Sequence, residues 1–252
     1  HAHSQELYDK MAELGWLGLL LPEEYGGADL SVVDLIVVAE ELGRALTPSP
    51  FFANLQGSLA VLHGGTDAQR KEILPEVASG RRVLSFAITE ESGTENADEI
   101  ATRATRSGSG WTLSGTKLFV PDGQSADAIV VAARSGAAGE GGISLFVVER
   151  GAPGLAITPL RSMDQTRRIA EVRFDGTPAQ LLGREGSGWE TWQTVRRHAL
   201  VYLSAEALGG AGRRICATRE PGGTPLAEDI RELVLERRSE AMPASAEVLL
   251  MF

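Results

Sequence analysis

Two adjacent arginines, Arg167 and Arg168, follow the polar segment Asp164-Gln165-Thr166. A guanidinium group binds phosphate oxygens through paired N–H bonds, so an arginine pair is suited to a phosphate-containing ligand. A solvated turn has the same composition, and the sequence leaves both interpretations open. The four histidines lack the spacing of metal ligands, so no metal site is expected, and no residue is assigned a catalytic role.

Two further segments combine a strand-like pattern with a polar end. The first, Phe86-Ala87-Ile88-Thr89-Glu90, opens into a polar loop that contains Gly93. The second, at 115–123, reads Gly-Thr-Lys-Leu-Phe-Val-Pro-Asp-Gly, so it carries an aromatic side chain and ends at a Pro-Asp-Gly turn. Taken alone, the apolar side chains of both segments are also typical of the core of a sheet.

The hydrophobic spacing predicts helices in the first 80 residues and strands after them. Helical spacing covers 5–20, a segment capped by Asp29 or Ser31 that runs to Leu42, and 51–63. A fourth helix, capped by Thr66 or Asp67, ends before Pro75 or near Gly80. Strand-like runs separated by glycine-rich turns cover 83–88, 101–107, 111–120, 128–133, 143–148, 155–159 and 170–174. A further helix is predicted over 186–208. This order favours an α+β fold: a helical N-terminal domain, a small β-barrel or sandwich middle domain, one more helix, and a short α/β tail.

The composition narrows the classes of protein to which the chain can belong. Of its 252 residues, 43% are hydrophobic and 23% are charged, as in a globular protein. The net charge of −10 argues against a general nucleic-acid surface, and no apolar run is long enough to span a membrane. The single cysteine, Cys216, suits a reducing cytosol. We therefore expect a cytoplasmic protein without nucleic-acid or membrane partners.

An ordered series of motifs across residues 5–212 resembles the acyl-CoA dehydrogenase family. The motifs are Leu-Gly-Trp at 14–16, Pro-Glu-Glu-Tyr-Gly-Gly at 22–27, Glu-Glu-Leu-Gly at 40–43, the two strand segments, Leu-Gly-Arg-Glu-Gly-Ser-Gly-Trp at 182–189, and Ala-Glu-Ala-Leu-Gly-Gly at 205–210. The resemblance implies a helical domain at 1–82, a β domain at 83–185, and the first helix of a C-terminal helical domain at 186–213. It also implies FAD as cofactor, acyl-CoA as substrate, an electron-transfer partner, and assembly into homo- or hetero-oligomers.

Carried over position by position, the resemblance places eight residues against FAD: Phe86, Ile88, Thr89, Thr94, Glu95, Phe119, Val120 and Pro121. Backbone donors and the Thr89 hydroxyl would bond to the flavin ring and tune its electronics. Phe119 would lie against the ring, and Glu95 would also face the acyl-CoA. Glu91, Glu95 and Pro121 stand where the family pattern has a proline, a small residue and a threonine. These changes predict weak or absent binding of FAD by the isolated chain and weakened binding of CoA.

The family's reaction removes the α-proton of an acyl-CoA with a glutamate base and passes hydride from the β-carbon to the flavin. The resemblance places that base in the C-terminal helical domain, beyond its first helix. No glutamate of this sequence matches its position. The leading interpretation is therefore an acyl-CoA dehydrogenase-like flavoprotein fragment that is catalytically incomplete and shows no turnover.

Residues 214–252 resemble a second family, the thymidylate kinases. The resemblance is carried by Thr-Arg-Glu-Pro-Gly-Gly-Thr at 218–224, and it implies that Arg219 approaches the phosphate of dTMP. The phosphate-binding pattern Gly-x-x-x-x-Gly-Lys-Ser/Thr occurs nowhere in the sequence. Two alternative functions follow: a fragment of a dTMP kinase, or a non-catalytic partner subunit of a flavin enzyme.

Overall fold

The structure, a computed structural model, describes residues 4–93, 96–164 and 166–212. These residues belong to one compact unit, residues 1–212. The predicted tail at 214–252 lies outside the described residues. The helices, strands, contacts and pocket all belong to the described residues.

Four helices precede the strands: α1 (Gln5–Glu13), α2 (Val32–Arg44), α3 (Phe51–Gly64) and α4 (Asp67–Ala78). The helix predicted over 5–20 stops earlier, because Gly15 takes a left-handed backbone with φ 75° and a short 3-10 turn, Trp16–Gly18, follows it. A capping box begins α4: the Thr66 hydroxyl accepts from the Gln69 amide, and the Gln69 side chain accepts from the Thr66 amide.

Seven strands follow: β1 (Leu84–Ala87), β2 (Arg103–Ser107), β3 (Gly110–Pro121), β4 (Ala128–Arg134), β5 (Ile143–Glu149), β6 (Leu155–Pro159) and β7 (Ile169–Leu182). They form one sheet in the order β1-β4-β2-β3-β7-β5, with β6 beside β7 and a further pairing of β4 with β5. Most pairs are antiparallel, while β1 and β2 each run parallel to β4. The extra pairing joins β4, β2, β3, β7 and β5 into a continuous ring.

The strand alternation divides the apolar side chains between two cores. Leu84, Phe86 and Ile88 belong to the cluster that includes the helices, whereas Ala87 belongs to the cluster enclosed by the strands. Side chains alternate between the two faces of a strand, so β1 contributes to both cores. This arrangement confirms the predicted α+β fold with a helical N-terminal region and a β region after it.

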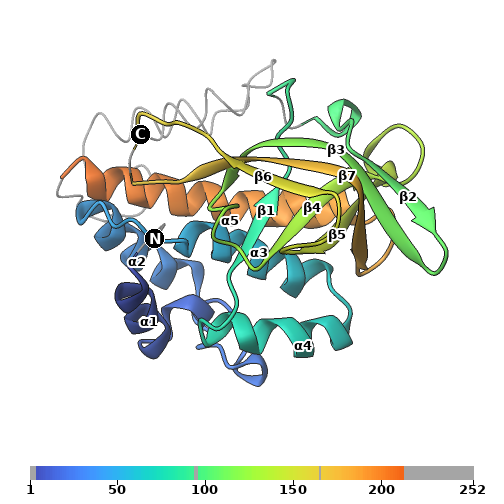
Figure 1. Ribbon diagram of the computed structural model, residues 1–252. Helices are drawn as coiled ribbons and strands as arrows, with labels where there is room; N and C mark the ends of the chain where they lie inside the picture. Colours follow the sequence, from blue (N-terminus) through green and yellow to red (C-terminus); the bar gives the residue numbers. More distant parts are fainter. Residues whose placement is uncertain (1–3, 94–95, 165, 213–252) are drawn as a thin grey trace, which may run out of the picture. The chain divides into compact units, whose positions relative to one another are not determined.

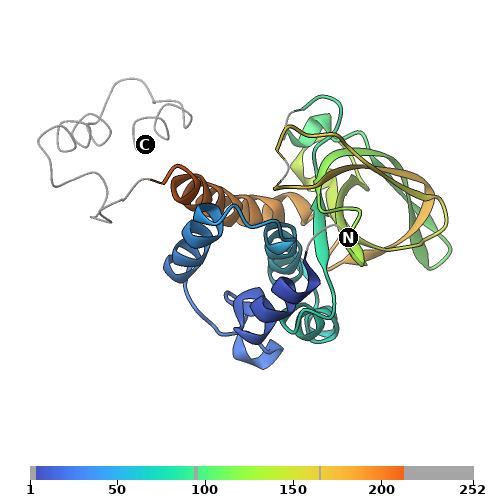
Figure 2. The ribbon, with the colours of Figure 1, turned by 60° about the vertical axis from the view of Figure 1, so that its left-hand side comes forward.

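The last described helix, α5 (Gly188–Gly210), packs against α2 and α3. Figure 1 shows it in orange beside the sheet, and Figure 2 shows the helices gathered on one side of the strands. Trp189 and Trp192 are buried on this helix. No helix among the described residues is long and apolar enough to cross a membrane.

Candidate functional site

The two segments singled out in the sequence lie side by side at the ends of β1 and β3. The Leu118 amide donates to the carbonyl oxygen of Thr89 at 2.9 Å. Thr89 is half-buried, and no hydrogen bond to its hydroxyl is found among the described residues. A hydroxyl is therefore available at the junction of the two strand ends.

A buried ion pair holds this junction together. The Lys117 ammonium, with no solvent exposure, donates to Glu90 Oε1 at 2.7 Å and to the carbonyl of Ile88 at 3.0 Å. Glu90 also accepts from the amides of Ala101 and Thr102. Burial lowers the pKa of Lys117 to about 8 against the opposing attraction of Glu90. Burial opposes ionisation of Glu90 too, yet Lys117 and Thr102 keep its pKa below the ordinary value.

Phe119 projects from a bulge in β3. The register between β3 and β7 shifts between Lys117 and Val120, and Phe119 takes φ 53° with 55% of its surface exposed. A left-handed backbone is unfavourable for a bulky side chain, so the surrounding contacts must impose it. Val120 returns to the sheet and is buried. The Phe119 side chain is thereby exposed to solvent, one residue after the Leu118 amide that bonds to Thr89.

The structure places the other predicted flavin-facing residues as follows. Ile88 is buried in the core shared with the helices. Phe86 lies in the same core and stacks on Trp192, with ring centroids 4.9 Å apart and an interplanar angle of 12°. Pro121 is half-buried, and its carbonyl accepts from the Ser85 hydroxyl. Thr94, Glu95 and Arg219 lie outside the described residues.

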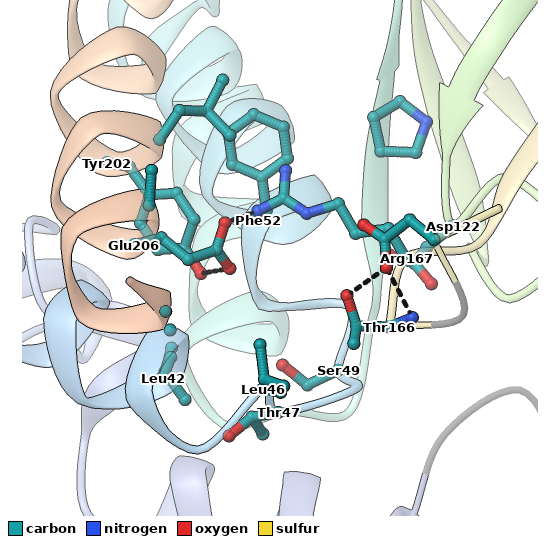
Figure 3. Close-up of a pocket in the computed structure, with 16 residues that line it drawn as sticks. Leu42, Leu46, Thr47, Ser49, Phe52, Asp122, Thr166, Arg167, Tyr202 and Glu206 are labelled. Carbon is teal, nitrogen blue, oxygen red and sulfur yellow. Dashed lines mark hydrogen bonds and ion pairs between the residues drawn. The ribbon is translucent and has the colours of Figure 1, made fainter. Parts of the chain in front are cut away.

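A pocket of about 390 Å³ begins where β3 ends (Figure 3). It is formed by the end of α2, the start of α3, the end of β3, the loop before β7, and α5. The lining residues are Leu42, Gly43, Leu46, Thr47, Ser49, Phe52, Pro121, Asp122, Asp164, Thr166, Arg167, Tyr202, Leu203, Glu206, Ala207 and Gly210. Pro121 belongs both to the strand end and to the pocket, which makes the two features continuous.

Glycines allow α2 and α5 to approach closely behind the pocket. A Cβ atom on Gly43 would lie 2.0 Å from the Glu206 carbonyl oxygen, and one on Gly209 would lie 1.9 Å from the Glu40 carbonyl oxygen. Any larger residue at either position would force the helices apart. The close approach sets where α5 presents Tyr202 and Glu206 to the pocket.

Arg167 forms part of a polar wall in this pocket, together with Glu206, Tyr202 and Phe52. Figure 3 shows its guanidinium beside Glu206. The guanidinium carbon lies 4.5 Å from the centre of the Phe52 ring. The Tyr202 hydroxyl donates to Glu206 at 3.1 Å. Burial raises the pKa of Tyr202 to about 12. Of the two interpretations of the arginine pair, the solvated turn does not describe Arg167.

Asp122 adds a second acidic group to the pocket, one residue beyond Pro121. It is 5% exposed, and its backbone has φ 47°. Burial raises the pKa of its carboxyl group to about 7, although Arg167 and Arg168 act in the opposite direction. The polar wall was not predicted from the sequence. Tyr202 and Glu206, four residues apart on one helix face, are the signal that could have pointed to it.

The two strand ends carry the kinds of group that FAD requires. A flat conjugated ring needs an apolar face and nearby hydrogen-bonding groups, and the bulge supplies both in the exposed Phe119 ring and the Thr89 hydroxyl. These residues therefore fit the cofactor. No group of three or more histidine, cysteine, aspartate or glutamate residues suited to a metal ion occurs within the described ranges.

Comparisons with known proteins identify the family. Residues 1–81 match the acyl-CoA dehydrogenase N-terminal domain, and residues 85–177 match the acyl-CoA dehydrogenase middle domain. The acyl-CoA dehydrogenase FadE12 of Mycobacterium tuberculosis is 39% identical over 242 residues, which cover 90% of this chain and 62% of the relative. The cyclohex-1-ene-1-carbonyl-CoA dehydrogenase of Geobacter metallireducens is 35% identical, with 80% of this chain and 55% of the relative covered.

A solved structure agrees with these sequence matches. The crystal structure of a putative acyl-CoA dehydrogenase from Mycobacterium smegmatis is 30% identical, with a TM-score of 0.78, and the match covers 83% of this chain and 57% of that one. The chain thus spans a little over half the length of these relatives. The comparisons give no support to the resemblance of residues 214–252 to thymidylate kinases. From its first residues through residue 177, this chain carries the N-terminal and middle domains of the acyl-CoA dehydrogenase family.

Proposed function

We propose that this chain supplies the FAD-facing strand ends and the acyl pocket of an FAD-dependent acyl-CoA dehydrogenase. The observation that carries the proposal is the continuity between the Phe119 bulge and the pocket through Pro121. A cofactor held at the bulge would lie beside a cavity that can receive the acyl group of its substrate. Family membership supports the same reaction class.

When bound, FAD supplies a hydride acceptor for oxidation of the bond between the α- and β-carbons of the thioester. The Phe119 ring offers an apolar face to the cofactor, and the Thr89 hydroxyl offers it a hydrogen bond. The Lys117–Glu90 pair fixes the junction from which both side chains project. Helices α2, α3 and α5 line the pocket, in whose wall Arg167 and Glu206 are paired.

The proposal also includes domain boundaries at residues 82, 185 and 213. It assigns Thr94 and Glu95 to the cofactor site and Glu95 to the substrate site. It further includes assembly into oligomers and an electron-transfer partner. The dTMP kinase and partner-subunit hypotheses also stay predictions. No described residue favours either of them over the flavin site.

Visible spectroscopy tests the proposal with the chain loaded with FAD. Binding of an acyl-CoA beside the flavin should shift the flavin absorption band near 450 nm, because the ring then loses contact with water. Free CoA, which lacks the acyl group, is the control and should cause a smaller change. An FAD-loaded chain whose spectrum is the same with and without acyl-CoA would contradict the proposal.

A further inference from the structure

The pocket beside the Phe119 bulge carries an unusual wall for a site that would receive a plain alkyl chain. Leu42, Leu46 and Phe52 give it apolar surface. Three carboxyl groups and one guanidinium line it as well: Asp122, Asp164, Glu206 and Arg167. An alkyl group laid against such groups would remove water from them without offering a hydrogen bond in return.

The Arg167–Glu206 pair retains hydrogen-bonding capacity toward the cavity. Glu206 accepts from Tyr202 through Oε1 and from Arg167 through Oε2, whereas a carboxylate has about four acceptor positions. Arg167 bonds to Glu206 and also hydrogen-bonds to the Tyr202 side chain, which leaves some of its five N–H donors. A donor and an acceptor therefore stand together in the same wall.

The charges of the wall restrict the kind of ligand group that can use them. A carboxylate on the ligand would be repelled by Asp164 and Glu206, whereas an ammonium has only donors and so cannot use the N–H groups of Arg167. A hydroxyl carries no charge and can donate and accept at once, so it can pair with Glu206 and Arg167 together.

We infer that this pocket selects acyl groups that carry a neutral hydroxyl substituent over unsubstituted acyl chains. The inference that the ligand is a CoA thioester rests on the proposed function. The inference that it carries a hydroxyl group rests on the polar wall alone. A site built to hydrogen-bond a ligand hydroxyl rejects the analogue that lacks it, because its own polar groups are then left unpaired. The expected preference is about tenfold or more in the dissociation constant.

Isothermal titration calorimetry on the full chain tests the inference with a matched six-carbon series. The probes are hexanoyl-CoA, hexanoyl-CoA hydroxylated at carbon 4, 5 or 6, and adipoyl-CoA, which ends in a carboxylate. At least one hydroxylated probe should bind about tenfold more tightly than hexanoyl-CoA, and adipoyl-CoA should bind no more tightly than hexanoyl-CoA. Equal binding of the whole series, tighter binding of adipoyl-CoA, or binding of no probe would overturn the inference.

Variants tie the preference to the wall. Glu206→Met removes the acceptor and Arg167→Met removes the donor, and each should reduce the hydroxyl preference. Arg173→Met, an exposed position on β7, should leave it unchanged. If both variants kept the full preference for hydroxylated acyl groups, the polar wall could not be its cause. An independent FAD titration separates the two ideas: FAD binding without hydroxyl preference contradicts the inference only, and hydroxyl preference without FAD binding contradicts the proposed function.

Discussion

At the scale of single residues, Lys117 is the side chain on which the junction of the two strand ends most depends. Its ammonium is fully buried and is bonded to both Glu90 and the carbonyl of Ile88. Removal of one partner from a buried ion pair leaves the other charge without compensation. The pair thus fixes the geometry of the candidate site through an interaction that tolerates little change.

Lys117→Met should lower the free energy of unfolding by about 3–5 kcal/mol, because the Glu90 carboxylate would stay buried without its cation. Urea denaturation measures this loss. The double variant Lys117→Met with Glu90→Gln should recover part of the stability, since no buried charge remains. A single variant as stable as the unmodified chain would show that the pair contributes nothing to the junction.

Asp122 should make stability depend on pH near neutrality. Burial raises the pKa of its carboxyl group from 3.8 to about 7 in the folded protein. Between these values the folded protein retains a proton that the unfolded chain has released, so the free energy of unfolding should fall as pH rises from about 4 to about 7. Asp122→Asn should flatten this part of the profile, measured by denaturation at several pH values. An unchanged slope in the variant would contradict the raised pKa.

The site was only partly predictable at the residue scale. Phe119 and Pro121 were identified because they lie in a contiguous motif, and the structure places both at the end of β3. Phe52, Arg167 and Glu206 come from three distant segments, so no local pattern brings them together. Neither could spacing predict the positive φ of Phe119, which depends on the neighbouring strands.

At the scale of elements, the crossing of α2 and α5 controls the shape of the pocket. Gly209 lies against the Glu40 carbonyl, where a Cβ atom would be 1.9 Å away. Gly210 is the next residue of the same helix, but a Cβ atom there would lie 3.5 Å from its nearest neighbour, the Gly43 carbonyl oxygen. The two glycines offer a matched pair for testing the crossing.

Gly209→Ala should destabilise the protein by about 1–3 kcal/mol, because the added methyl group overpacks the helix crossing. Gly210→Ala should be neutral or stabilising, since alanine favours a helix and space is available. Thermal unfolding of both variants provides the comparison. Equal stability of the two would mean that α2 and α5 do not meet as closely as described.

A long and regular hydrophobic repeat predicted whether a segment is a helix or a strand. The residues at which each element begins and ends were predicted less well. The strand predicted at 111–120 appears as Gly110–Pro121. The strand predicted at 170–174 is much longer, Ile169–Leu182, because pairing with three neighbours extends it through Gly176 and Pro178. Tertiary pairing thus overrides the local signal of a glycine and a proline.

At the scale of the whole molecule, the family was recognisable because many weak motifs occur in the expected order. No single motif is specific, yet the family's two domain models match the chain in the same order, at 1–81 and 85–177. We propose on this basis that the strand ends of the middle domain bind FAD and that the pocket lined by the neighbouring helices receives the acyl group. Pro121, at the end of β3, belongs to both the strand end and the pocket.

Titration of FAD with the chain, followed by quenching of flavin fluorescence, tests this interpretation most directly. The unmodified chain should bind FAD saturably, and Phe119→Ala should weaken binding by about tenfold, equivalent to about 1.4 kcal/mol, because the aromatic face is lost. Leu14→Ala, which removes another exposed apolar side chain far from the strand ends in sequence, should bind FAD as the unmodified chain does. Absence of saturable binding, or equal binding by the Phe119 variant, would contradict the assignment of the flavin site to these strands.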